Sequence, residues 1–199
     1  MYYVIYKTFP FEEVAVVQSD FLLDLYSHVK NYETHTGRNY LPALQSVFQS
    51  PDEWIIDLSQ RKISVLLEVL KLQTEKKSVK LRRCSEEESE VMSFLQCLPY
   101  ISQLRFWVIY NKESRMSAVR LLLNLCVAAV ETDRYTGTRF STLLSSVCSY
   151  KTFPFDEDVD QQSDFLLDLY SHVKNYETQT GRSYLFLFIS FFMGIVGDM

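Results

Sequence analysis

The chain has 199 residues, of which 47% are hydrophobic and 23% are charged, and its net charge is −5. This length and composition predict one globular domain with a sizeable core, and they exclude a disordered chain. The mild acidity argues against nucleic acid as the main partner, because nucleic-acid binding needs a clustered basic surface.

The first predicted element is a helix over residues 19–36, with Ser19 or Asp20 as its N-cap. Gly37 is expected to end this helix, because glycine adopts the left-handed C-cap conformation without a steric cost. One apolar stripe follows the helical spacing, and its members are Leu22, Leu25, Tyr26, Val29 and Tyr32. A second, short helix is expected before Pro51, with one face made by Leu41, Leu44 and Val47.

Two strands separated by a helix are predicted next. The stretch EWIIDLS, residues 53–59, alternates as a strand does, with its inward side made by Trp54, Ile56 and Leu58. Residues 61–72 read as a helix whose apolar face consists of Ile63, Leu66, Leu67 and Leu70. The stretch SVKLRRC, residues 78–84, is the second strand, with Val79 and Leu81 inward.

The clearest helix signal covers residues 85–98. Ser85 and Glu88 match a capping box, and the acidic residues of the first turn favour the positive end of the helix dipole. The buried face of this helix is expected to consist of Val91, Phe94, Leu95 and Leu98. The stretch ISQLRFW, residues 101–107, is predicted as a third strand with Leu104 and Phe106 inward.

The centres of these strands, at Ile56, Val79 and Leu104, are 23 and 25 residues apart. A strand, a turn and a helix every two dozen residues is the period of leucine-rich repeats. The predicted fold class is therefore α/β, a leucine-rich-repeat-like solenoid with short parallel strands and outer helices. The helix–glycine–helix blocks on either side are longer and more helical than such a repeat, so an all-α helical-repeat solenoid is the alternative.

An internal duplication accounts for those blocks. The stretch SDFLLDLYSHVKNYETHTGR starts at Ser19 and returns at Ser163 with one change, while a weaker copy starts at Leu121. Three glycines share the same Thr-Gly position in the copies: Gly37, Gly137 and Gly181. Tandem self-similarity indicates units that each bury a face against the next. We expect a repeat domain over residues 1–185 without polar caps at its ends, and an apolar tail over residues 186–199 outside the pattern.

Two segments resemble a known group of proteins: LLEVLKLQTEKKSVKLRRCSEEESEVMSFLQCLPYISQLRF and LLDLYSHVKNYETQTGR. They are similar to tandem segments of uncharacterised fish proteins, which look like divergent leucine-rich-repeat receptors of the NACHT type. The usual L-x-x-L-x-L-x-x-N/C spacing is met only in part, since ISQLRFW has no Asn or Cys at that place. The sequence also has no G-x-x-x-x-G-K-[ST] loop. The resemblance thus implies the sensing portion of an innate-immune-type receptor.

Neither catalysis nor cofactor or metal binding is predicted. His28 and His172 occupy the same position of two copies, and His35 is replaced by Gln179 in the second copy. Residues placed by duplication serve a shared scaffold more often than a unique active site. The four cysteines have apolar or unremarkable neighbours and no C-x-x-C spacing, so they are expected to be reduced core thiols: Cys84, Cys97, Cys126 and Cys148.

The predicted location is the cytoplasm, because the N-terminus lacks the apolar region of a signal peptide. The segment from Phe186 to Val196 is apolar, but it is shorter than the roughly 20 residues that a membrane-spanning helix needs. A membrane tether through this segment is therefore an alternative rather than the main prediction.

A candidate protein-binding surface follows from strand alternation. If Val79 and Leu81 point inward, the residues between them point outward, and stacked strands bring their outward residues into lateral rows. The predicted rows are Asp57–Lys80–Arg105 and Ser59–Arg82–Trp107. Exposed arginine and tryptophan on a rigid sheet are common interface anchors. The site residues of this hypothesis are Asp57, Lys80, Arg82, Arg105 and Trp107.

These observations favour a non-enzymatic protein-interaction repeat module. The alternatives are a helical-repeat scaffold, a membrane-tethered protein, and a nonfunctional fragment of a longer repeat array, because solenoid ends need polar caps to stay in solution.

Overall fold

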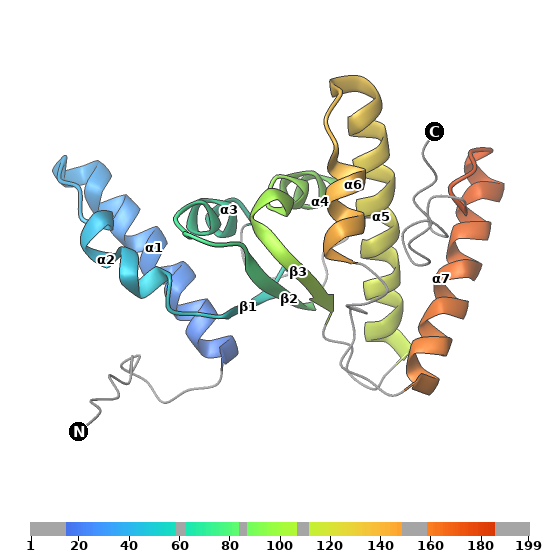
Figure 1. Cartoon of the computed structure of the whole chain (residues 1–199), viewed down its shortest axis with the longest axis horizontal. Coiled ribbons are helices and arrows are strands. Elements are labelled where there is room, and N and C mark those ends of the chain that lie inside the picture. Colours follow the sequence, from blue (N-terminus) through green and yellow to red (C-terminus); the bar gives the residue numbers. More distant parts are fainter. Residues whose placement is uncertain (1–14, 59–62, 84–86, 107–111, 149–158, 186–199) are drawn as a thin grey trace.

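The computed structural model describes residues 15–58, 63–83, 87–106, 112–148 and 159–185. The elements in chain order are α1 (Ala15–Thr36), α2 (Leu41–Phe48), β1 (Glu53–Asp57), α3 (Ile63–Lys71), β2 (Lys77–Arg83), α4 (Glu88–Leu95), η1 (Leu98–Tyr100), β3 (Ile101–Phe106), α5 (Lys112–Thr136), α6 (Phe140–Val147) and α7 (Val159–Thr180). Helices α1 and α2 lie at one end, the sheet with α3 and α4 lies in the middle, and α5, α6 and α7 form the other end (Figure 1).

The three strands form a parallel sheet in the order β1-β2-β3. Alternating side chains on one face of the sheet form two continuous rows, Trp54–Val79–Leu104 and Ile56–Leu81–Phe106. All six are buried. The strands and their inward residues are therefore as predicted, and three parallel strands rule out the all-α alternative. The fold is mixed helix and sheet.

The first helix begins earlier than predicted, at Ala15, so Ser19 lies inside α1 and is not its N-cap. The Ser19 hydroxyl is fully buried, donates to the carbonyl of Ala15 (3.0 Å) and accepts from the backbone N–H of Ile55 (3.0 Å). Ile55 belongs to β1, which pairs with β2 on its other side. Ser19 therefore satisfies a donor on the outer edge of the sheet, where an orphan buried N–H would be costly.

Helices cover both edges of the sheet, because α1 packs against β1 and α6 packs against β3. The predicted absence of polar caps concerns the ends of the repeat domain, and it stays a prediction. At the far end, α5 packs against α4, α6 and α7.

Helix α4 begins at Glu88, and the side chain of its N-cap residue, Glu87, makes no capping hydrogen bond. The predicted capping box that starts at Ser85 is therefore wrong, and Ser85 itself lies outside the described residues. The predicted apolar residues are all buried, with Val91, Phe94 and Leu95 on α4. Leu98 is buried in η1, because the helix ends at Leu95 and not at residue 98.

Among the described residues, no helix is both long and apolar enough to cross a membrane. The tail from Phe186 to Val196 lies outside them, so the tether alternative stays a prediction.

Candidate functional site

The sheet places the predicted binding surface differently from the sequence prediction. The register pairs Lys80 with Ile55 on one side and with Arg105 on the other, and it pairs Asp57 with Arg83 after an irregularity in β1. The Lys80–Arg105 part of the predicted row is therefore confirmed, and the place of Asp57 in it is wrong, since Ile55 stands beside Lys80. Alternation along a strand has a period of two residues, so it fixes the face of a side chain but not its lateral neighbour.

The exposure of the side chains removes further residues from the predicted binding surface. Asp57 is only 7% exposed and so is not available as an anchor. Arg82 is exposed, while Lys80 and Arg105 are half-buried. Trp107 and Ser59 lie outside the described residues. Of the five predicted site residues, Arg82 is the one that the structure places on an exposed surface.

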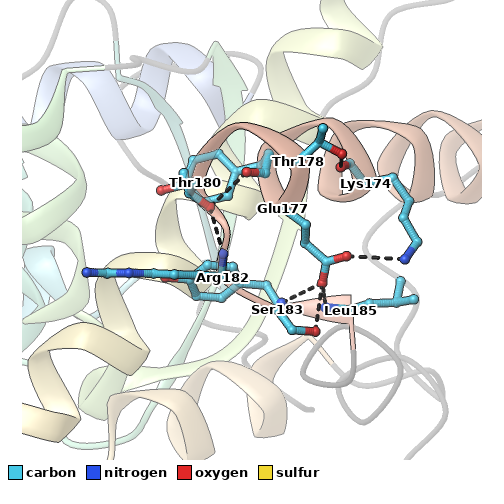
Figure 2. Close-up of polar contacts among 9 residues, drawn as sticks. Lys174, Glu177, Thr178, Thr180, Arg182, Ser183 and Leu185 are labelled. Carbon is cyan, nitrogen blue, oxygen red and sulfur yellow. Dashed lines mark hydrogen bonds and ion pairs between the residues drawn. The ribbon is translucent and has the colours of Figure 1, made fainter.

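Each of the three helices that end at a left-handed glycine, α1, α5 and α7, carries a carboxylate brace to the segment after that glycine, and the sequence analysis missed it. In the third unit, one oxygen of Glu177 accepts hydrogen bonds from the backbone N–H groups of Tyr184 and Leu185, at 2.6 and 2.7 Å, and from the Ser183 hydroxyl (Figure 2). Between Glu177 and these donors the chain reverses at Gly181, whose φ is +68°. The carboxylate of one helix thus caps the backbone donors of the segment that follows.

The same brace recurs in the other two units. Glu33 accepts from the N–H groups of Tyr40 and Leu41, at 2.6 and 2.8 Å. Asp133 accepts from the N–H groups of Phe140 and Ser141, at 2.7 and 2.9 Å. In every unit the acidic residue stands four positions before the left-handed glycine. That constant spacing is the signal from which the brace is predictable.

The brace predicts a specific loss of stability in acid. The hydrogen bond from the Leu185 N–H, with those from Tyr184 and Ser183, lowers the pKa of Glu177 from 4.5 to about 2. A carboxyl whose pKa is lower in the folded state stabilises the fold at pH values above its unfolded-state pKa. This contribution is lost as the pH falls from about 4.5 towards 2. Glu177→Gln should therefore flatten the pH dependence of the urea unfolding midpoint in this window. Glu75→Gln, in the exposed turn after α3, is the control, and an equal flattening there would contradict the assignment.

The duplicated helix has two apolar faces. We call Leu22, Leu23 and Tyr26 of α1, and their copies Leu166, Leu167 and Tyr170 of α7, the strand face. We call Phe21, Leu25, Val29 and Tyr32 of α1, and their copies Phe165, Leu169, Val173 and Tyr176 of α7, the helix face. The single apolar stripe predicted from the sequence mixes members of both faces.

The two copies bury different faces although their sequences are nearly identical. Helix α1 buries its strand face against β1 and α3, and α7 buries its helix face along α5. Leu23 is 1% exposed in the first copy, whereas its counterpart Leu167 is 65% exposed. The reverse holds for Phe165, which is 1% exposed, and its counterpart Phe21, which is 37% exposed. Each copy therefore exposes side chains of the face that the other one buries, which are Phe21 and Tyr32 on α1 and Leu166, Leu167 and Tyr170 on α7. Leu25 and Val29 of α1 are partly buried against the core.

Polar contacts fix how α7 lies on α5. Arg115, near the start of α5, donates through its Nε to Asp168 in the first half of α7, at 2.7 Å. Near their ends, one oxygen of Glu131 accepts from Arg182 at 2.8 Å and from the Tyr184 hydroxyl at 3.0 Å. The two helices therefore run parallel, with charge-assisted hydrogen bonds at both ends of an apolar contact.

The described cysteines have no reactive character. Cys97, Cys126 and Cys148 are buried free thiols, as predicted. Burial raises the pKa of Cys97 and Cys148 to about 12, so neither forms a thiolate at neutral pH. No group of three or more His, Cys, Asp or Glu side chains within the described ranges is arranged to hold a metal ion.

Comparison with protein-family models, curated proteins and solved structures found no match to this chain.

Proposed function

We propose that the chain is a non-enzymatic protein-interaction module built from stacked repeats. Its strand–helix units are of leucine-rich-repeat-like character, and a helix–glycine–helix unit stands at each end of them. The parallel order β1-β2-β3 and the continuous inward rows support this interpretation, because neighbouring units of a solenoid share one core in this way. The immune-receptor context implied by the resemblance stays a prediction.

The observation that carries the proposal is the pair of open faces on α1 and α7. Both are apolar faces on ordered helices, and each is a copy of a face that packs tightly elsewhere in the chain. Exposed apolar surface of this kind marks protein–protein contact sites. Helix-on-helix and helix-on-sheet packing are then the expected modes of binding.

Pull-down with quantitative mass spectrometry tests the proposal through three surface variants. Tyr32→Asp changes the helix face of α1, Tyr170→Asp changes the strand face of α7, and Arg82→Glu changes the sheet surface; all three residues are exposed. We expect at least one captured protein to fall by about tenfold or more with one variant and not with the others, since anchors at interface centres contribute about 2 kcal/mol or more.

Circular dichroism would confirm that each variant keeps the fold of the parent chain. If no captured protein depends on any of the three surfaces, the proposed function is wrong.

A further inference from the structure

The helix face of α1 is a ready-made site for a helix of defined chemistry. We propose that this face, with Arg38 and Tyr40, binds an α-helix of a second protein that carries the surface α5 presents to α7. That surface has two apolar residues and a glutamate at positions i, i+4 and i+8, which are Leu123, Val127 and Glu131 in α5. The proposal rests on the proposed function and names the class of partner.

The site is held in the geometry that already binds α5 in the other copy. The brace holds Tyr40 in place, because its backbone N–H donates to the Glu33 carboxylate at 2.6 Å. The backbone N–H of Tyr184 donates to Glu177 at the same distance of 2.6 Å. The ring centroids of Tyr32 and Tyr40 are 5.5 Å apart, and those of Tyr176 and Tyr184 are 5.6 Å apart. A preorganised surface binds with a smaller entropic cost.

The surface is also open. Tyr32 is 58% exposed. It lines a groove of about 610 Å³ with His28, Val29, Asn31, His35 and Tyr40. The copies of four of these residues, His172, Asn175, Tyr176 and Gln179, line a smaller hollow of about 300 Å³ together with α5 residues. The groove on α1 is thus the same surface without its helix.

Charge sets the direction and the specificity of binding. In the third unit Glu131 accepts from Arg182 and from the Tyr184 hydroxyl. Arg38 and Tyr40 are the copies of these two residues, and Arg38 is exposed. A partner helix that runs parallel to α1 would bring its glutamate to Arg38 and Tyr40 and its apolar residues to Val29 and Tyr32.

A second copy of this chain is a poorer occupant. Its own α5 is covered by α7, so binding would require α1 of one molecule to displace α7 of another. Such an exchange exposes the helix face of α7 when it buries that of α1, so the buried apolar area does not increase. Association also costs translational entropy. We therefore expect the full chain to be monomeric by sedimentation velocity. Self-association that Tyr32→Asp abolishes would overturn the proposed partner in favour of a second copy.

The probe is a fluorescent peptide of residues 112–136, the sequence of α5. It carries Leu121→Gln, Leu122→Lys, Leu125→Lys and Cys126→Ala, because these four buried positions lie on the side of the helix away from Val127 and would make the peptide aggregate. Fluorescence anisotropy with the full chain should show saturable 1:1 binding. Tyr32→Asp should weaken it by at least about tenfold, whereas Tyr170→Asp on α7 should leave it unchanged.

A charge exchange tests the predicted ion pair directly. Arg38→Glu in the chain or Glu131→Lys in the peptide should each weaken binding, and the two together should restore most of the affinity. Absence of saturable binding, equal losses with Tyr32→Asp and Tyr170→Asp, or no recovery in the exchanged pair would each overturn the assignment. The proposed function would survive these results if captured proteins depended on Arg82 or Tyr170 instead.

Discussion

Leu23→Ala is expected to lower the free energy of unfolding by about 2–5 kcal/mol, while Leu167→Ala in the second copy changes it by less than about 0.5 kcal/mol. The two leucines occupy the same position of a duplicated helix. Leu23 is buried on the face of α1 that packs against β1 and α3, and Leu167 is exposed. Truncation therefore leaves a cavity at the first site and removes almost no contact at the second.

Urea unfolding followed by circular dichroism measures both free energies in otherwise identical chains. Because the local sequences match from Ser19 to Thr34 and from Ser163 to Thr178, helix propensity contributes equally and cancels in the comparison. Similar losses for the two variants would show that α7 also buries its strand face, and would remove the observation on which the proposed function depends.

The strands, their inward residues and the glycine C-caps could be predicted from the sequence because each depends on local patterns. Val79 and Leu81 alternate with polar residues on β2, and Gly37 follows the last turn of α1 with φ +66°. Burial of the helical face from Val91 to Leu95 followed from its spacing alone.

The errors concern interactions between elements. Serine is a common N-cap residue, but the Ser19 hydroxyl accepts a hydrogen bond from the backbone of Ile55 in β1 instead. That contact joins residues 36 positions apart, so no local pattern indicates it. Lateral register also escaped prediction, because strand alternation assigns Ile55 and Asp57 to the same face and does not say which of them stands beside Lys80.

The two-faced helix escaped prediction for a related reason. Apolar residues at Phe21, Leu22 and Leu23 cover more than one helical stripe, and the sequence does not say which neighbour each stripe meets. Only the packing of α1 on β1 and of α7 on α5 assigns the faces. The duplication then indicates what each exposed face can bind, because a copy of that face packs against a known element elsewhere in the chain.

Val173→Asp is expected to detach α7 from α5 while the sheet stays folded. Val173 is fully buried, and a carboxylate without a partner at such a site costs several kcal/mol, on the order of 3 or more. Helix α7 packs mainly along α5, so the loss of this contact opens the helix locally rather than the whole chain.

Hydrogen exchange measured by mass spectrometry separates local from global opening. Peptides from residues 163–180 should lose protection by about a hundredfold or more, since 2.8 kcal/mol corresponds to roughly that factor, and peptides from β2 should exchange as in the parent chain. Val29→Asp is the matched control, because Val29 is the same residue in the first copy and is only partly buried. Because Val29 packs only partly against the core, this variant should lower the protection of α1 much less than Val173→Asp lowers that of α7, and it should leave α7 unchanged. An equal loss of α1 protection in Val29→Asp would mean that the helix face of α1 supports the fold of this chain as much as that of α7 does, and that it is not a surface available to a partner.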